Sequence, residues 1–116
     1  MPAMDIPALQ QQLRQFAAAR QWPPFHTPKN LAMALVVEAA ELAEIFQWHT
    51  PEQSLAAGAE PAQHERIADE VADVLLYLVQ LADHCGVDVD AAVLRKLQKN
   101  ALKYPPPAAP AAPGPA

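Results

Sequence analysis

Hydrophobic side chains recur every three or four residues in four segments of this chain, with polar side chains between them. In the first segment Ile6, Leu9 and Leu13 follow this spacing, which places apolar residues on one face of an α-helix. No segment shows the alternation of apolar and polar residues that is typical of a strand. The pattern predicts helices over residues 6–21, 28–48 and 61–84, and a fourth that is capped by Asp88 or Asp90 and continues to about residue 103.

The predicted helices begin and end at residues with suitable backbone preferences. Thr27 followed by Pro28 is typical of an N-cap and a first helical residue, and Gly86 is suited to end the third helix. Thr50 and Gln53 form a capping-box pattern, which predicts a further short turn of helix before residue 58. Four main helices joined by short loops predict an all-α fold, a four-helix bundle.

Two of these helices carry acidic residues where apolar ones are expected. Glu38 fills a gap in the apolar seam of the second helix, and Glu41 lies one turn further along. Glu70 and Asp73 repeat this spacing on the third helix, which is apolar around most of its circumference. If the two helices pack together, four carboxylates converge, and their repulsion either raises their pKa values or requires a cation. Hard oxygen ligands favour Mg²⁺, with Mn²⁺ as an alternative.

These acidic residues have two other interpretations. Some of them could face solvent and only adjust the electrostatics of their helices. A ferritin-like di-iron site needs a Glu-x-x-His pattern on two helices, and the sequence contains none. The matched pairs on two apolar helices favour the magnesium site.

Length and charge limit the functions that the chain can have. Its 116 residues are enough for one domain, which we place at residues 1–104. Much of the 52% apolar content is alanine, so a domain this small is expected to complete its core by associating with copies of itself. The net charge is −5 and there is no basic run. Because of its small core, we expect the protein to be a homo-oligomer. Because of its charge, we expect it not to bind nucleic acid.

The remaining features indicate a cytoplasmic protein. The longest apolar run, 74–79, is much shorter than the roughly 20 residues that a membrane span needs, and the N-terminal segment does not resemble a secretory signal. The single cysteine, Cys85, suits a reducing compartment and is expected to be buried and unreactive. Residues 105–116 are rich in proline and alanine, which predicts an extended or disordered tail.

Four stretches together resemble a known family. They are FHTPKNLAMAL (25–35), EAAELAEIFQW (38–48), DEVADVLLYLVQLAD (69–83) and GVDVDAAVLRKLQKNALKYP (86–105). In combination they resemble the MazG-like all-α nucleoside triphosphate (NTP) pyrophosphatase superfamily, particularly its dCTP pyrophosphatase branch. The resemblance covers most of residues 16–105.

The resemblance implies a role for each matching residue. It makes Glu38, Glu41, Glu70 and Asp73 the Mg²⁺ ligands and the catalytic carboxylates. It places Trp22, His26, Trp48 and Tyr77 in the nucleoside pocket, although Trp48 and Tyr77 could equally be core residues. It assigns phosphate contacts to Lys96, Asn100, Lys103 and Tyr104, with Lys29 and Asn30 as further candidates; Lys103 also suits the helix dipole. Some relatives place a base-contacting histidine where this chain has Leu13 and Arg14, which leaves the base preference open.

The reaction that the resemblance implies is hydrolysis between the α- and β-phosphates of a nucleoside triphosphate. The expected substrates are dCTP and 5-modified dCTP, the products are a monophosphate and pyrophosphate, and the purpose is sanitation of the nucleotide pool. A homotetramer is expected ahead of a dimer. Two alternatives stay open: a pyrophosphatase for another nucleotide, including phosphoribosyl-ATP, and a non-catalytic helical module for oligomerisation or regulation.

Overall fold

The computed structural model describes residues 4–108, and every regular element within them is a helix. In chain order the elements are α1 (Ile6–Ala19), η1 (Pro23–Phe25), α2 (Pro28–Phe46), α3 (Pro51–Ala56), η2 (Ala57–Ala59), α4 (Pro61–His84) and α5 (Val89–Lys103). The predicted all-α fold is confirmed, and α3 is the short helix expected after Thr50. Residues 105–108 are not helical, and the rest of the predicted tail, 109–116, lies outside the described residues.

Side-chain caps fix where the helices begin. The Thr27 hydroxyl accepts a hydrogen bond from the Asn30 backbone N–H at 3.2 Å and opens α2. The Thr50 backbone N–H donates to the Gln53 side-chain oxygen at 2.9 Å, and the Gln53 backbone N–H donates to the Thr50 hydroxyl at 3.1 Å. This is the reciprocal capping box that the sequence predicts. Gly86, with φ of +66°, follows the last turn of α4, where a left-handed residue can end a helix. The starts of α2 and α3 and the end of α4 are therefore determined by residues at those positions.

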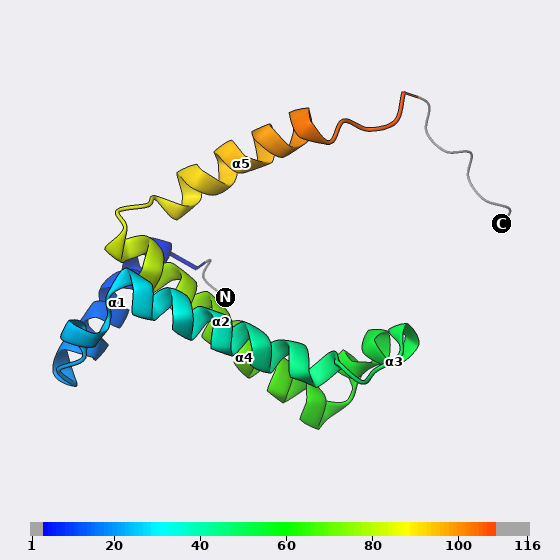
Figure 1. Cartoon of the computed structure of the whole chain (residues 1–116), viewed down its shortest axis with the longest axis horizontal. Coiled ribbons are helices and arrows are strands. Elements are labelled where there is room, and N and C mark those ends of the chain that lie inside the picture. Colours follow the sequence, from blue (N-terminus) through cyan, green and yellow to red (C-terminus); the bar gives the residue numbers. More distant parts are fainter. Residues whose placement is uncertain (1–3, 109–116) are drawn as a thin grey trace, which may run out of the picture.

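The α2 and α4 helices run side by side in opposite directions and form the centre of the molecule (Figure 1). Leu31 on α2 and Val79 on α4 are each 1% exposed, and the other buried hydrophobic residues are Ala17, Ile45 and Ala57. Because few side chains are fully buried, the core that one chain builds is small for its length.

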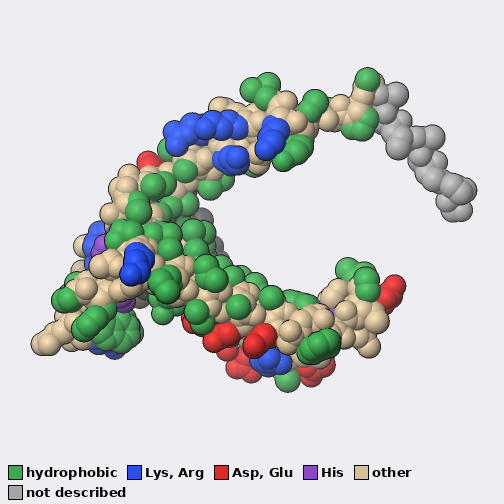
Figure 2. All heavy atoms as spheres, viewed as in Figure 1, with side chains coloured by type: hydrophobic (Ala, Val, Ile, Leu, Met, Phe, Trp, Pro, Cys, Tyr) green, Lys and Arg blue, Asp and Glu red, His purple; other side chains and the backbone are tan. Residues whose placement is uncertain are grey.

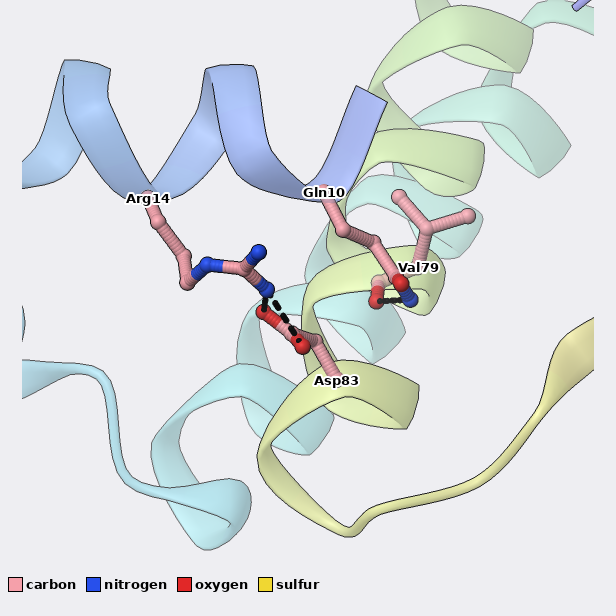
Figure 3. Close-up of polar contacts among 4 residues, drawn as sticks. All are labelled: Gln10, Arg14, Val79 and Asp83. Carbon is pink, nitrogen blue, oxygen red and sulfur yellow. Dashed lines mark hydrogen bonds and ion pairs between the residues drawn. The ribbon is translucent and has the colours of Figure 1, made fainter. Parts of the chain in front are cut away.

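Polar contacts hold α1 across α4 near the C-terminal end of that helix (Figure 3). One guanidinium nitrogen of Arg14 contacts both carboxylate oxygens of Asp83, at 2.7 and 2.6 Å. The Gln10 amide donates to the backbone carbonyl of Val79 at 2.8 Å. An exposed ion pair contributes only about 0–1 kcal/mol, so these contacts fix the orientation of α1 more than they stabilise the fold.

The last helix, α5, extends away from the other three long helices (Figure 1). It leaves large apolar side chains exposed, among them Leu94 at 64% and Leu97 at 60%. The bundle within one chain therefore consists of α1, α2 and α4, and the fourth long helix of the predicted four-helix bundle does not join it. Its spacing of apolar residues predicts a packed face, but no element of residues 4–108 covers that face.

Cys85 corrects one expectation from the sequence, because it is exposed rather than buried. It is the C-cap residue of α4, where the chain turns away towards α5. The apolar run before it predicts burial, but the helix ends there and no element of residues 4–108 covers the thiol. Within the same residues, no helix combines the length and the hydropathy that crossing a membrane would require.

Candidate metal and nucleotide site

Three carboxylates meet at the contact between α2 and α4. Glu38 and Glu41 lie three residues apart on α2 and so share one face of that helix. Glu70 comes from α4, which passes alongside in the opposite direction. Each of the three side chains offers one carboxylate oxygen, and these oxygens lie within 4.8 Å of one another. Asp73, one turn after Glu70 on α4, is outside this group but close enough for its charge to act on Glu38.

The cluster is electrostatically unsatisfied without a cation. Burial raises the pKa of Glu38 from its ordinary value to about 7, assisted by hydrogen bonding to the Glu70 and Glu41 carboxyl groups and by the charges of Glu41 and Asp73. One oxygen of Glu38 and one of Glu70 are buried and have no hydrogen-bond partner among the described residues. Buried polar atoms normally have a partner. The two orphaned oxygens therefore fit a ligand set for a hard divalent cation.

Among residues 4–108, no Lys or Arg forms a salt bridge with the carboxylates of this cluster. In the part of the chain that the structure describes, the Arg14–Asp83 pair is the one salt bridge. Figure 2 shows acidic side chains gathered along α2 and α4 with a single patch of Lys or Arg among them, while a larger group of Lys and Arg lies on the distant α5. The acidic cluster can therefore attract a cation from solution.

A cavity of about 220 Å³ lies beside the acidic residues, between α1, η1 and α4. Its residues are mostly aromatic or aliphatic, and the complete lining is Leu13, Phe16, Ala17, Trp22, His26, Asp73, Leu76, Tyr77 and Gln80. The ring of Trp22 lies 5.7 Å from that of Phe16 and 5.9 Å from that of His26, measured between centroids. Flat rings with a few polar groups suit a planar ligand. Asp73 belongs to this lining and also acts on Glu38, so the cavity adjoins the acidic cluster.

The loop that carries Trp22 and His26 is tied to the start of α2. The Asn30 side-chain amide donates to the Phe25 carbonyl at 3.0 Å, and the His26 backbone N–H donates to the Pro23 carbonyl at 3.0 Å. Two successive prolines further limit the backbone of this loop. The cavity wall formed by Trp22 and His26 is therefore held in place by local structure.

The structure separates Trp48 from the other residues that we assigned to the pocket. Trp22 and His26 precede α2, whereas Trp48 follows it, and a helix of 19 residues spans about 28 Å at 1.5 Å per residue. The Trp48 side chain is 87% exposed. Trp22, His26 and Tyr77 line the cavity together, but Trp48 does not reach the cavity of its own chain.

The candidate phosphate-binding residues are also apart from the cluster. Lys96, Asn100 and Lys103 lie on α5 and Tyr104 caps it, and α5 points away from α2 and α4 (Figure 1). Lys29 and Asn30 lie in the first turn of α2 and line neither this cavity nor a second, larger cavity of about 440 Å³ beside Arg14. The Asn30 amide is engaged with the loop. One chain alone therefore brings together the carboxylates and the aromatic cavity, but not the residues expected to contact phosphate.

Sequence reasoning missed part of the cavity. Phe16 on α1 and Gln80 on α4 line it, although neither was among the expected site residues. Gln80 could have been found, because it continues the polar stripe of Asp73 and Tyr77 at the next helical spacing. Phe16 gave no such signal, since an aromatic residue in an amphipathic helix is usually part of the core.

A family model, curated relatives and a solved structure each match most of this chain. The model of the MazG-like family matches residues 33–110. The dCTP pyrophosphatase 1 of Homo sapiens is 47% identical over 91 residues, 78% of this chain and 54% of that protein, and the dCTP pyrophosphatase 1 of Bos taurus is 45% identical over the same shares. The crystal structure of a pyrophosphatase from Archaeoglobus fulgidus DSM 4304 superposes with a TM-score of 0.80 at 38% identity, covering 90% of this chain and 96% of that one.

The chain spans about half the length of the curated relatives that it matches. The family model covers well over half of the chain, from the first turns of α2 through α5, and so includes all four acidic residues of the site. This chain therefore belongs to the MazG-like family.

Proposed function

We propose that this protein is a Mg²⁺-dependent nucleoside triphosphate pyrophosphatase that converts dCTP, and dCTP modified at position 5, to the monophosphate and pyrophosphate. The observation that carries this proposal is the cluster of Glu38, Glu41 and Glu70 beside a cavity walled by aromatic rings. The relatives with 44–47% identity are dCTP pyrophosphatases, which supports the same substrate. Phosphates would lie at the cluster and the nucleoside in the cavity.

Glu38, Glu41, Glu70 and Asp73 would hold the ion, and Mn²⁺ could replace Mg²⁺ because it prefers the same oxygen ligands. When bound, such an ion neutralises phosphate charge and lowers the pKa of a coordinated water. The orphaned oxygens of Glu38 and Glu70 support this assignment. The chain itself contributes fixed carboxylates, which position the phosphates and do not have to reorganise during the reaction.

The aromatic residues would position the nucleoside. Trp22 and His26 form one wall of the cavity and Tyr77, on α4, forms another. Tyr77 lies four residues after Asp73, so it is one turn away from the acidic end of the site. A nucleoside held between these walls would have its 5′-phosphates directed at the carboxylates.

We also infer that the protein is a homo-oligomer, with a tetramer favoured over a dimer. The apolar face of α5 is exposed in one chain. Four of the eight Lys and Arg residues lie on this helix, namely Arg95, Lys96, Lys99 and Lys103. This positive charge would complement the acidic side chains of another copy, which lie along α2 and α4 in Figure 2. In such an assembly Trp48, Lys96, Asn100, Lys103 and Tyr104 would complete the site of a neighbouring copy, and Lys29 stays a candidate for phosphate contact.

The alternatives are less well supported. A purely structural module has no need for buried carboxylate oxygens without partners, because such atoms destabilise a fold. A pyrophosphatase for another nucleotide, including phosphoribosyl-ATP, would use the same carboxylates and differ in the cavity. The cavity beside the carboxylates is small and aromatic, which favours a nucleoside with a single-ring base.

Removing one carboxylate tests the metal assignment. We expect Glu38→Gln to lower Mg²⁺-dependent pyrophosphate release from dCTP by more than about 100-fold, since even the outer-shell partners of metal ligands account for 10–100-fold. Glu65→Gln is the matched control, because Glu65 is exposed on α4 outside the cluster. Assays with Mg²⁺ and with EDTA, together with circular dichroism to verify the fold, provide the measurement. Wild-type rates in the Glu38→Gln variant would refute the assignment.

The raised pKa of Glu38 predicts how the metal-free protein responds to pH. An unfolded glutamate titrates near 4.5 and the folded Glu38 near 7. The folded state therefore holds this proton more tightly, and the resulting stabilisation is complete below pH 4.5 and lost as pH rises to about 7. In EDTA, the Tm of the wild type should fall over this interval relative to that of Glu38→Gln. Parallel melting curves for the two proteins across this interval would contradict the prediction.

A charge placed on the apolar face of α5 tests the assembly. We expect light scattering to give the wild type a mass that is a multiple of 12.5 kDa, and Leu97→Glu to shift it towards 12.5 kDa because a buried unpaired charge is costly. Gln98→Glu adds the same charge at the neighbouring exposed position and should leave the mass unchanged. A wild type of 12.5 kDa at micromolar concentration would disprove the homo-oligomer.

A further inference from the structure

Gln80 ends a polar stripe that runs along α4 on the cavity side. Asp73, Tyr77 and Gln80 are spaced four and three residues apart, so they lie on one face of the helix, and all three line the 220 Å³ cavity. Seven residues of helix span about 10 Å, a length comparable to that of a nucleotide from its α-phosphate to the far edge of its base. With the phosphates near Asp73, the base edge would lie near Gln80.

The orientation of the Gln80 amide is fixed by a hydrogen bond. Its Nε2 donates to the backbone carbonyl of Leu76 at 3.0 Å. A carbonyl only accepts, so the nitrogen must be the atom that faces it. The side-chain oxygen, Oε1, accepts no hydrogen bond within the described residues. The half-buried Gln80 therefore offers an acceptor with unused capacity at the cavity wall.

Two polar side chains near this end of the cavity are already engaged. A larger cavity of about 440 Å³ adjoins the first and shares Leu13, Ala17, His26 and Gln80 with it. Two of its polar residues, Gln10 and Arg14, bind the Val79 carbonyl and the Asp83 carboxylate (Figure 3). The His26 ring also lines both cavities. Gln80 is the one amide side chain that lines both cavities, at the place where the base edge would lie.

We propose that Gln80 determines base specificity by accepting a hydrogen bond from the exocyclic 4-amino group of a cytosine ring. Uracil and thymine carry a carbonyl oxygen at that position, so two acceptors would face each other and neither would be satisfied. A site that is built to pair with a substrate group discriminates against the analogue that lacks it, because its own polar atom is then left unpaired. This inference rests on the proposed function, since it assumes that the cavity holds a nucleoside.

Binding of the product nucleotides tests the inference separately from catalysis. dCMP and dUMP differ at the 4-position and in the protonation of the adjacent ring nitrogen. With Mg²⁺ present, isothermal titration calorimetry should show wild-type protein binding dCMP at least about tenfold more tightly than dUMP, the effect of one well-placed hydrogen bond. Gln80→Met has a similar shape without the acceptor and should remove most of this preference. Gln80→Glu keeps an acceptor and should retain it.

Gln10→Met is the matched control. Gln10 also donates its amide to an α4 carbonyl, but it lines only the larger cavity, so its replacement should leave the dCMP preference unchanged. A preference that persists in Gln80→Met, or a wild type that binds neither nucleotide, would overturn the inference. If the wild type hydrolyses no triphosphate while Gln80→Met still removes the dCMP preference, the proposed reaction fails and the assignment of Gln80 stands.

Discussion

Three carboxylates converge where α2 and α4 pack together, and a charge is expensive to bury at such a contact. Burial and mutual repulsion raise the pKa of Glu38 to about 7, and buried oxygens of Glu38 and Glu70 lack partners within the described residues. A divalent cation would relieve both problems at once, because it supplies positive charge and accepts oxygen ligands. The buried carboxylates thus destabilise the contact between α2 and α4. Cation binding at these carboxylates would explain why the fold keeps them there.

The second constraint is the small core of a single chain. Leu31 and Val79 are the large side chains that are almost completely buried, while α5 exposes its apolar face and carries half of the Lys and Arg residues. One copy therefore has carboxylates and an aromatic cavity but lacks nearby basic groups. The same exposed helix accounts for the need for a partner and for the separation of Lys96 and Lys103 from the cluster. Assembly and completion of the phosphate site would then be one event.

The sequence predicted the features that depend on local chemistry. Threonine caps and proline positions located the starts of α2 and α3, because the capping hydrogen bonds involve neighbouring residues only. The i, i+3 spacing also predicted that Glu38 and Glu41 share a face of α2. These inferences required no knowledge of distant parts of the chain.

Features that depend on tertiary placement were less accessible. Trp48 was grouped with Trp22 by resemblance, although a 19-residue helix separates them and leaves Trp48 exposed in one chain. An amphipathic helix also has the same sequence pattern whether its apolar face packs within its own chain or against another copy. The position of α5 could therefore not be predicted. Cys85 sits after an apolar run, but burial depends on what covers the end of a helix.

The most direct test of this account is the identity of the products formed from dCTP with Mg²⁺. Carboxylates that hold the phosphates for cleavage between the α- and β-positions should give dCMP and pyrophosphate in equal amounts, with none formed in EDTA. Separation of the nucleotides by anion-exchange chromatography and an assay that distinguishes pyrophosphate from orthophosphate provide both readings. Release of dCDP and orthophosphate would contradict the proposed reaction, even if the metal were bound as described.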